Sequence, residues 1–522
     1  MINTNRRTLL TGAAGLAGGM ALTGRSAPAQ ARTTPPLPTD AWHPVPPGIV
    51  RKDLKRWATD TWRSLDAMTD PATGLVADNI GADLSTRSGY TSPTNIGGYL
   101  WSAMVARDLG IISPADCSAR IRTTLTTLAR MDRHEHSGMY YNWYDEATGE
   151  VLRIWPDSGD VVVPFVSSVD MGWLGAALWL VANGDPANRS AALALFTPMR
   201  WDVFFDRDFW RQPGANYGGF YTEDPKGGGV NPDVVLREPL NGVGGPSLWY
   251  TASHHYDTCV SEARMVTYLG IIRDQIPGGA YYATFRTFPP DWTWPEMPPV
   301  GEFRTYLGVE VFEGAHTYRG MQVVPGWGGS MFEELMPDMF VPESAWAPRS
   351  WGVNHPLHVR AQREHGLIEA GYGYWGFSPA SDPFAGYREY GVDALGLNPE
   401  GYFSDKEKTD YHYDNPPTRY GDGVVTPHAA FLAMMHEPKQ AIQNLQRLEK
   451  NFDCYGPGGF HDAIAVRSGT VAHRHLSLDQ AMVMGSVGNV VLNNRVKSWF
   501  ATDLVHGKLA PVIGPEVFSA RG

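Results

Sequence analysis

Apolar residues recur at helical spacing along most of this chain. They fall three or four positions apart over residues 54–68, 96–104 and 121–131, as they do on one face of an α-helix. Ser113 and Pro114 precede the third segment, and a capping serine followed by proline is typical of a helix start. Residues 169–181 are apolar nearly all round, which predicts a helix buried on more than one side.

Similar patterns predict further helices at residues 254–275, 355–370, 426–435, 437–450 and 476–500. Long segments rich in Gly, Pro and aromatic residues separate the helices, at 210–250, 277–330 and 371–425. Loops of this length are usually functional or disordered, and the Trp and Tyr content argues against disorder. The alternation predicts one domain of paired helices with its loops gathered at one end. Two helical domains divided near residue 240 are the alternative.

The N-terminal residues have the features of an export signal. Thr4–Leu10 contains a twin-arginine pattern, an apolar run follows to Leu22, and Ala29–Ala31 offers a small-residue cleavage site. We therefore expect a secreted or periplasmic protein exported by the twin-arginine route; an uncleaved N-terminal anchor is the alternative. The predicted divisions are a signal peptide at 1–31, a Pro-rich linker at 32–50, a catalytic domain at 51–505 and a C-terminal tail at 506–522.

Composition narrows the class of ligand. Of the 522 residues 12% are aromatic and 19% are charged, and the net charge is −12, which disfavours nucleic-acid binding. Aromatic residues without basic charge suit neutral, flat-faced ligands such as sugars, although most of them belong in a core. The three cysteines, Cys117, Cys259 and Cys454, form no disulfide framework.

A carboxylate and a guanidinium, Glu262 and Arg264, stand two residues apart in an apolar segment that is predicted to be helical. Charges in such a setting are costly unless they are paired or used. A sheltered Glu tends to have a raised pKa, which suits a general acid. Glu262 is therefore a candidate catalytic residue, and a structural ion pair is the alternative.

Two further carboxylates stand at predicted helix starts. Asp170 begins the very apolar helix after Ser167 and Ser168, and Glu333 follows Ser330 by three residues, the spacing of a capping box. Each is a candidate catalytic or sugar-binding carboxylate. Each is equally well explained as a helix cap.

Other polar and aromatic residues in the loops are candidates for substrate binding. Asn95 lies at the end of a Gly-bearing loop that runs into a helix, where capping is the alternative role. Tyr141 and Trp143 belong to an alternating aromatic segment that is suited to lining a sugar-binding groove or to forming a core strand.

The later loops add Trp327 and Trp375, each beside glycines, and the acidic residue Asp382. Glycine lets a backbone approach a ligand closely. Asp479 opens the last long predicted helix, where it is suited to capping or to supporting the site.

No metal or cofactor is expected. The histidine clusters lack the spacing of zinc enzymes. We find no serine-hydrolase elbow, P-loop or dinucleotide fingerprint. The clusters stand at residues 134–136, 254–255 and 473–475.

Eight motifs in order resemble the glucoamylase-like family of bacterial proteins, which includes glycoside hydrolase family 144 (endo-β-1,2-glucanases) and the C-terminal part of cyclic β-1,2-glucan synthases. They are Tyr90–Gly97, Tyr141–Asp145, Ser167–Asp170, Ser261–Arg264, Gly329–Glu333, Trp375–Ser378, Thr426–Ala430 and Leu478–Gln480.

The resemblance implies an all-α fold, an (α/α)6 toroid with its site at the loop end, acting on β-linked glucans with paired carboxylates. It implies Glu262 as general acid, and it matches Asp170 and Glu333 to acidic positions of these enzymes. In the synthases a Glu follows the Trp-Gly-x-Ser segment, whereas this chain has Pro379. That departure argues against a retaining, transglycosylating mechanism.

The leading hypothesis is an exported glycoside hydrolase that cleaves a β-glucan, β-1,2-linked by resemblance, with inversion. A transglycosylase or phosphorylase on the same fold is the second, and a non-catalytic glycan-binding protein is the third. An oligo- or polysaccharide is the expected partner in each case, with no nucleic acid and no membrane after signal cleavage.

Overall fold

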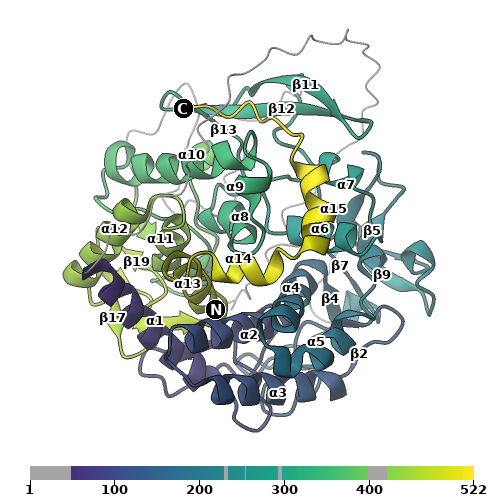
Figure 1. The fold of residues 1–522 in the computed structure, drawn as a ribbon, viewed down its shortest axis with the longest axis horizontal. Helices are drawn as coiled ribbons and strands as arrows, with labels where there is room; N and C mark the ends of the chain where they lie inside the picture. Colours follow the sequence, from purple (N-terminus) through teal and green to yellow (C-terminus); the bar gives the residue numbers. More distant parts are fainter. Residues whose placement is uncertain (1–48, 228–232, 253, 292–296, 398–419) are drawn as a thin grey trace.

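The computed structural model describes residues 49–227, 233–252, 254–291, 297–397 and 420–522. The predicted signal peptide and nearly all of the predicted linker therefore lie outside the described residues. Within these ranges the chain is rich in helices, as expected, but short antiparallel strands connect them (Figure 1). The expectation of an all-α chain is too simple, because the long aromatic loops form small sheets.

One set of helices lies around a common centre (Figure 1). These inner helices are α2 (Pro93–Asp108), α4 (Ser168–Gly184), α6 (Arg264–Ile272), α8 (Met331–Leu335), α11 (Pro427–Ala433) and α13 (Ser477–Val491). Helix α2 contacts α4 and α13, α4 also contacts α6, and α11 contacts both α8 and α13. Arg264 joins α6 to α8, because its guanidinium donates to the backbone carbonyls of Glu333 and Glu334.

A second set of helices packs outside the first. These outer helices are α1 (Ile49–Met68), α3 (Pro114–Arg130), α5 (Arg189–Phe196), α10 (Trp351–Glu364), α12 (Pro438–Asn451) and α15 (Asp503–Ile513). Helix α1 contacts α13, α3 contacts α2, α5 contacts α4, α10 contacts α8, α12 contacts α11 and α15 contacts α6. Three shorter helices complete the set: α7 (Gly279–Tyr282), α9 (Glu343–Trp346) and α14 (Arg495–Phe500).

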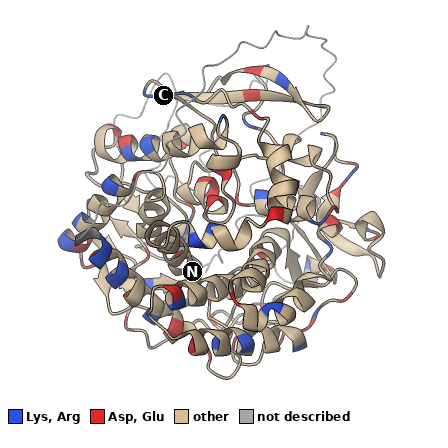
Figure 2. Ribbon diagram, viewed as in Figure 1, with Lys and Arg blue, Asp and Glu red and all other residues tan. Residues whose placement is uncertain are grey.

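The hydrophobic pattern explains which helices lie inside. Helix α4 buries nearly every residue, in agreement with its all-round apolar sequence. Helix α1 buries Leu54, Trp57 and Leu65 on one face and exposes Lys52 and Lys55 on the other, as an outer helix must. Figure 2 shows the same division, with Lys and Arg on peripheral elements such as α1.

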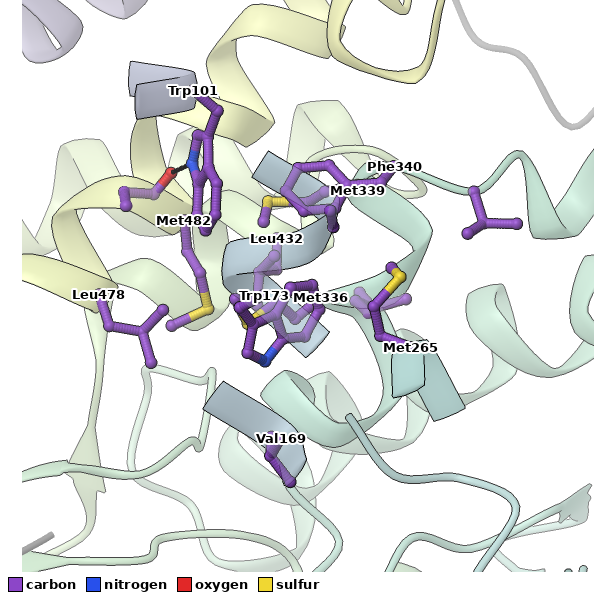
Figure 3. Packing of buried hydrophobic residues seen from close by; sticks show 14 of the residues in the cluster. Trp101, Val169, Trp173, Met265, Met336, Met339, Phe340, Leu432, Leu478 and Met482 are labelled. Atoms are coloured by element: carbon purple, nitrogen blue, oxygen red, sulfur yellow. Dashed lines mark hydrogen bonds between the residues drawn. The ribbon is translucent and has the colours of Figure 1, made fainter. Parts of the chain in front are cut away.

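The inner helices meet in a packed core rather than around an open channel. Figure 3 shows Trp101 of α2, Trp173 of α4 and Met265 of α6 pointing toward this core, which α8, α11 and α13 complete. The Trp101 indole donates to the carbonyl of Ala481 on α13 at 2.9 Å. Buried residues on both sides of residue 240 belong to this one cluster, which disfavours a division into two helical domains.

The loops fold into small antiparallel sheets. Their strands, in sheet order, are β4 (Phe165–Ser167), β7 (Gly219–Tyr221), β9 (Leu248–Thr251) and β8 (Val234–Arg237); β10 (His255–Tyr256), β6 (Ala215–Tyr217) and β5 (Phe205–Asp206); β11 (Val300–Tyr306), β12 (Val309–Tyr318) and β13 (Met321–Val323); and β16 (Val424–Val425), β19 (Ile464–Ala465) and β20 (Thr470–Val471). The two-stranded sheets pair β1 (Asn79–Gly81) with β21 (Arg474–Leu476), β2 (Arg133–His134) with β3 (Met139–Tyr140), β14 (Ala380–Ser381) with β15 (Tyr387–Arg388), and β17 (Tyr455–Gly456) with β18 (Gly459–Phe460).

The β11–β12 hairpin turns at Leu307 and Gly308, which follow Tyr306 and precede its partner Val309. Both turn residues have positive φ, +48° and +82°. A two-residue loop of this kind matches the right-handed twist of the strands that it joins. The turn therefore holds Leu307 at the outer end of the hairpin, where its side chain is exposed.

Several predicted helix boundaries change. The predicted helix 254–275 begins only at Arg264, because residues 255–256 pair with β6 as β10 and residues 261–263 form a bend and a turn. The helix predicted at 476–500 divides into α13 and α14 at Asn493 and Asn494, which both have positive φ. The predicted start at Ser113 is confirmed, since its side chain accepts from the Asp116 backbone N–H.

Residues 506–522 are part of the fold rather than a separate tail. They contribute most of α15, and the following Glu516 is buried in an ion pair with Arg286. The Gln322 and Arg521 backbones also bond to each other. All three cysteines are buried and none forms a disulfide. In the described part of the chain, every helix falls short of the length or apolarity needed to cross a bilayer.

Candidate active site

The first turns of the six inner helices join into one polar rim. We define the rim as residues 92–95, 167–170, 260–262, 326–333, 426–428 and 477–479. Contacts link each segment to the next, directly or through Trp173, residues 376–377 and Asp78, which lie outside this definition. They join Thr94 to Asp170, Trp173 to Glu262, Val260 to Gly326, Met331 to Phe377, Gly376 to Thr426, His428 to Asp479, Ser477 to Asp78, and Asp78 to Asn95.

Asp170 and Asn95 occupy adjacent parts of the rim. The Ser167 hydroxyl caps α4 by accepting from the Asp170 N–H, and the Asp170 carboxylate accepts from the Thr94 hydroxyl at 2.6 Å. Asn95 donates from its side-chain amide to Asp78 at 2.8 Å. Both predicted residues are fully buried. Asp170 therefore joins α2 to α4 rather than capping α4 with its side chain.

Glu262 lies in the turn that precedes α6, not within a helix as predicted. Its side chain is half-buried, and its carboxylate accepts a 2.6 Å hydrogen bond from the Trp173 indole. The predicted alternative was an ion pair with Arg264. The Arg264 guanidinium instead forms a bidentate pair with Glu343, at 2.7 and 2.8 Å. Glu262 thus has a neutral N–H among its donors.

Glu333 completes the capping box that its spacing predicts. Its carboxylate accepts from the backbone N–H groups of Trp327 and Gly328, at 3.1 and 3.0 Å, and from the Ser330 hydroxyl at 3.0 Å. Burial raises the pKa of Glu333, and the bonds from Gly328 and Ser330 only partly oppose this. The residue holds the glycine-rich loop in place, and its side chain is half-buried.

Asp257 is a carboxyl that the sequence analysis did not select. It lies five residues before Glu262 and is half-buried. Burial raises its pKa to about 6. Its backbone bonds to that of Phe285 at 2.6 Å, so the segment leading to Glu262 is anchored. The apolar neighbours Val260 and Cys259 were the only indication in the sequence that this carboxyl would be sheltered.

Directly behind the rim lies a buried ionic network. We define it as Arg264, Glu334, Asp338, Glu343, His355, His436 and Lys497. His355 contacts Glu334 at 2.6 Å and Glu343 at 3.3 Å. Although burial opposes its charge, the Glu334 carboxylate raises the pKa of His355 to about 9.

The carboxylates of this network behave in the opposite way. Burial alone would raise the pKa values of Glu334 and Glu343, but His355 and Arg264 outweigh that effect and lower them. Lys497 pairs with Asp338 at 2.9 Å. The network therefore holds charged groups in compensating pairs.

Two groups of side chains have ligand atoms close enough together to hold a metal ion. One is Asp338, Glu343 and His355 in the network, and the other is His428, Asp462 and Asp479 near the rim. In the first group, Glu343 already pairs with Arg264 and Asp338 with Lys497. The expectation that the protein binds no metal stays a prediction.

The aromatic candidates have different surroundings. Tyr141 and Trp327 are half-buried, as a surface for sugar rings requires. Trp143 is buried against Tyr90 and Trp155, with ring centroids 5.5 and 5.3 Å away.

Trp375, another predicted substrate-binding residue, is buried. It is 2% exposed, and its backbone bonds to the Asn444 side chain on α12. The loop folds back beneath α12 and brings the indole into the core. Trp375 therefore packs within the core.

Asp382 follows β14 and is buried. Its carboxylate accepts from the Phe384 N–H at 3.0 Å and contacts Arg388 at 3.5 Å. These contacts brace the β14–β15 turn. In the rim, His428 approaches Asp479 to 3.6 Å. His428 stood within a quoted motif but was not predicted as a site residue, because a single histidine after proline has no distinctive spacing.

Two family models match separate parts of the chain. One, described as "Putative glucoamylase", matches residues 302–502. The other, described as "Protein of unknown function (DUF3131)", matches residues 56–204. The relationship with the glucoamylase-like proteins that the motifs suggested is thereby confirmed.

Particular relatives agree. The chain is 28% identical over 272 residues to the cyclic β-(1,2)-glucan synthase of Rhizobium meliloti; the match spans 48% of this chain and only 8% of that protein. Two solved structures share the fold at 14% identity. A "putative glucoamylase" from Bacteroides uniformis has a TM-score of 0.62, with 90% of this chain and 98% of that chain covered. The endo-β-1,2-glucanase of Chitinophaga pinensis has a TM-score of 0.60, with 88% and 98% covered.

Proposed function

We propose that this protein is an exported glycoside hydrolase that cleaves β-1,2-linked glucan. The single observation that carries the proposal is the position of Glu262: a half-buried carboxylate in the rim, with Trp173 as a neutral donor and Asp170 on the adjoining helix start. Relatives named as a cyclic β-(1,2)-glucan synthase and an endo-β-1,2-glucanase support the substrate class. We further propose that the two sets of helices form an (α/α)6 toroid.

Glu262 would act as the general acid. Its side chain reaches the rim surface, and Arg264, which would favour its ionised form, is committed to Glu343. A neutral N–H donor stabilises the ionised carboxyl less than a guanidinium would, and a substrate that excludes water favours the protonated form. It would then deliver a proton to the glycosidic oxygen as the bond to the anomeric carbon breaks, and the proton leaves with the new hydroxyl end.

A second carboxylate would direct water to the opposite face of the sugar. Asp170 is the first candidate, since Thr94 and Trp173 place its helix beside Glu262. Glu333 is less suited, because backbone N–H groups already occupy both of its oxygens. The cleavage would proceed with inversion, which requires carboxyl groups about 6.5–9.5 Å apart in the working complex.

The test is product analysis on linear β-1,2-, β-1,3- and β-1,4-glucans, with and without inorganic phosphate. We expect short β-1,2-linked oligosaccharides in both conditions. NMR should show that each is first released with the anomeric configuration opposite to that of the cleaved bond. Sugar phosphates that appear only with phosphate would establish a phosphorylase instead. Binding without cleavage of any polymer would establish a glycan-binding protein.

Transglycosylation is the second candidate, favoured by the similarity to the synthase. Products longer than the starting chain, or cyclic products, would establish it.

Export by the twin-arginine route is also proposed, on the pattern at residues 4–10. Replacing both Arg6 and Arg7 with Lys should leave the protein in the cytoplasm of a bacterial host, whereas unchanged secretion would contradict this route.

A further inference from the structure

A pocket of about 570 Å³ lies outside the rim, between the loop at residues 210–213, helix α7 and the tip of the β11–β12 hairpin. We call it the hairpin pocket. Its volume is within the range of 300–1,000 Å³ typical of small-molecule sites. None of the catalytic candidates lines it.

The chemistry of its walls fits a sugar. Trp210 and Leu307 line the pocket and are 59% and 61% exposed. Single exposed apolar residues are ordinary, but these two line the same pocket. Arg211, Gln212 and Glu310 supply hydrogen-bonding groups. An aromatic face combined with polar groups of both signs suits neutral pyranose rings better than an anion or an apolar ligand.

The pocket is held in shape before any ligand binds. The Trp210 ring lies against Phe209 and Phe285, with centroids 5.7 and 6.0 Å away. The Gln212 side chain donates to the Phe209 carbonyl, which braces the loop. The two-residue turn fixes Leu307 opposite. A ligand therefore needs to order little of the protein, which favours binding.

Arg211 adds an observation that points to a ligand. Its guanidinium lies 4.3 Å from the Phe285 ring, and its Nε is buried with no hydrogen-bond partner among the described residues. Buried donors of this kind are rarely left unsatisfied. Burial and the nearby Arg286 lower the pKa of Arg211 to about 10. Because Arg211 also lines the pocket, its guanidinium would donate to a sugar hydroxyl bound there.

The same aromatic residue connects the pocket to the rim. Phe285 bonds through its backbone to Asp257 and Cys259, at 2.6 and 2.8 Å. Its ring also packs in one cluster with Phe288 and Trp327. The pocket is thus built on the segment that leads to Glu262.

We propose that the hairpin pocket is a second binding site for the glucan, holding a part of the polymer remote from the bond that is cleaved. The inference rests on the proposed function for the identity of the polymer. It concerns residues that take no part in the chemical step. A short oligosaccharide that fills only the rim would not reach the pocket, whereas a long chain would occupy both.

The test compares Trp210→Ala with Leu504→Ala, a matched loss of an exposed apolar side chain on α15. Trp210→Ala should raise KM for long β-1,2-glucan about 3- to 10-fold, the range that one aromatic contact supports. Its kcat, and both constants for a short oligosaccharide, should stay at the wild-type level. Arg211→Met should also raise KM for the long polymer. Leu504→Ala should leave KM and kcat unchanged for both substrates.

Native gels that contain the polymer supply a second readout. The polymer should retard the wild-type protein, and Trp210→Ala should relieve that retardation. This result would support glucan binding in the pocket even if no cleavage occurred, so the two proposals can fail separately. If wild-type protein cleaves the polymer while Trp210→Ala matches it in both assays, the pocket is not a binding site. Equal losses on long and short substrates would also overturn the inference.

Discussion

Glu333 and Glu334 are neighbours in sequence, yet their carboxyl groups have opposite electrostatics. Glu333 faces the rim and accepts from backbone N–H groups and a serine hydroxyl, and burial raises its pKa. Glu334 faces the ionic network and contacts His355, which lowers its pKa despite burial. Both groups lie on α8. The difference therefore comes from the charge of their partners and not from the depth of the helix.

The same division separates Glu262 from Glu343. Glu262 accepts from the neutral Trp173 indole, whereas Glu343 accepts two bonds from the Arg264 guanidinium. A neutral donor favours the ionised form of a carboxyl less than a buried cation does. The rim is thus suited to chemistry, and the network behind it holds the rim segments in register.

The largest effect should come from the rim. Glu262→Gln keeps the shape and the bond from Trp173 but cannot donate a proton to a leaving group. We expect a loss of about 10²–10⁴ in kcat on β-1,2-glucan, with thermal stability close to wild type. Glu223→Gln, a change at an exposed surface pair, is the control. Wild-type turnover by Glu262→Gln would remove this residue from the catalytic role.

The network should respond in stability. Arg264→Met leaves Glu343 buried without its guanidinium partner, and breaking such a pair costs about 3–5 kcal/mol. The matched control is Arg363→Met, since its pair with Glu437 is partly exposed and should contribute at most about 1 kcal/mol. Urea unfolding measures both. If the two variants lose the same stability, the distinction between network and surface pairs is wrong.

The network should also make stability depend on pH. The pKa of His355 rises from its ordinary value near 6.5 to about 9 in the folded state. The stabilisation is therefore complete below pH 6.5 and is lost as the pH rises through 9. Integrated over this shift, the free energy of unfolding should fall by about 3 kcal/mol between pH 6 and pH 9.

His355→Gln is the check on that assignment. It removes the titrating group, so the decline between pH 6 and pH 9 should largely disappear, on a lower overall stability. Glu334 and Glu343 have lowered pKa values, so their contribution is lost only at acid pH, as the pH falls through those folded-state values. A decline as steep in His355→Gln as in the wild type would place its origin in another group.

Local features of this fold were predictable from sequence, and long-range ones were not. The Ser113 and Ser330 caps were evident because a cap and its partner lie within three residues. The buried position of α4 followed from its all-round apolar composition. The start of α6 was misjudged because pairing of residues 255–256 with β6 overrides the helical pattern of that segment.

The candidate site shows the same limit. Asp170 and Glu333 were found because each stands at a predicted helix start, and Glu262 because it stands in an apolar segment. Trp375 was misjudged because Asn444, sixty-nine residues later, decides that its loop folds inward. The ionic network was not foreseen, since Arg264, Glu343 and His355 meet only through tertiary packing. Sequence spacing carries no information about such a meeting.

The smallest predicted effect concerns the boundary between rim and network. Ser330→Ala removes the hydroxyl that bonds both to the Glu333 backbone and to its carboxylate, and loss of such a cap costs about 1 kcal/mol. Glu333 would then retain the backbone donors of Trp327 and Gly328, so the loop should keep its shape and kcat should fall less than 3-fold, below about 0.7 kcal/mol. Urea unfolding and kinetics on the same preparation separate the two outcomes. A loss of activity as deep as that of Glu262→Gln, with stability unchanged, would instead assign Glu333 a direct part in the reaction.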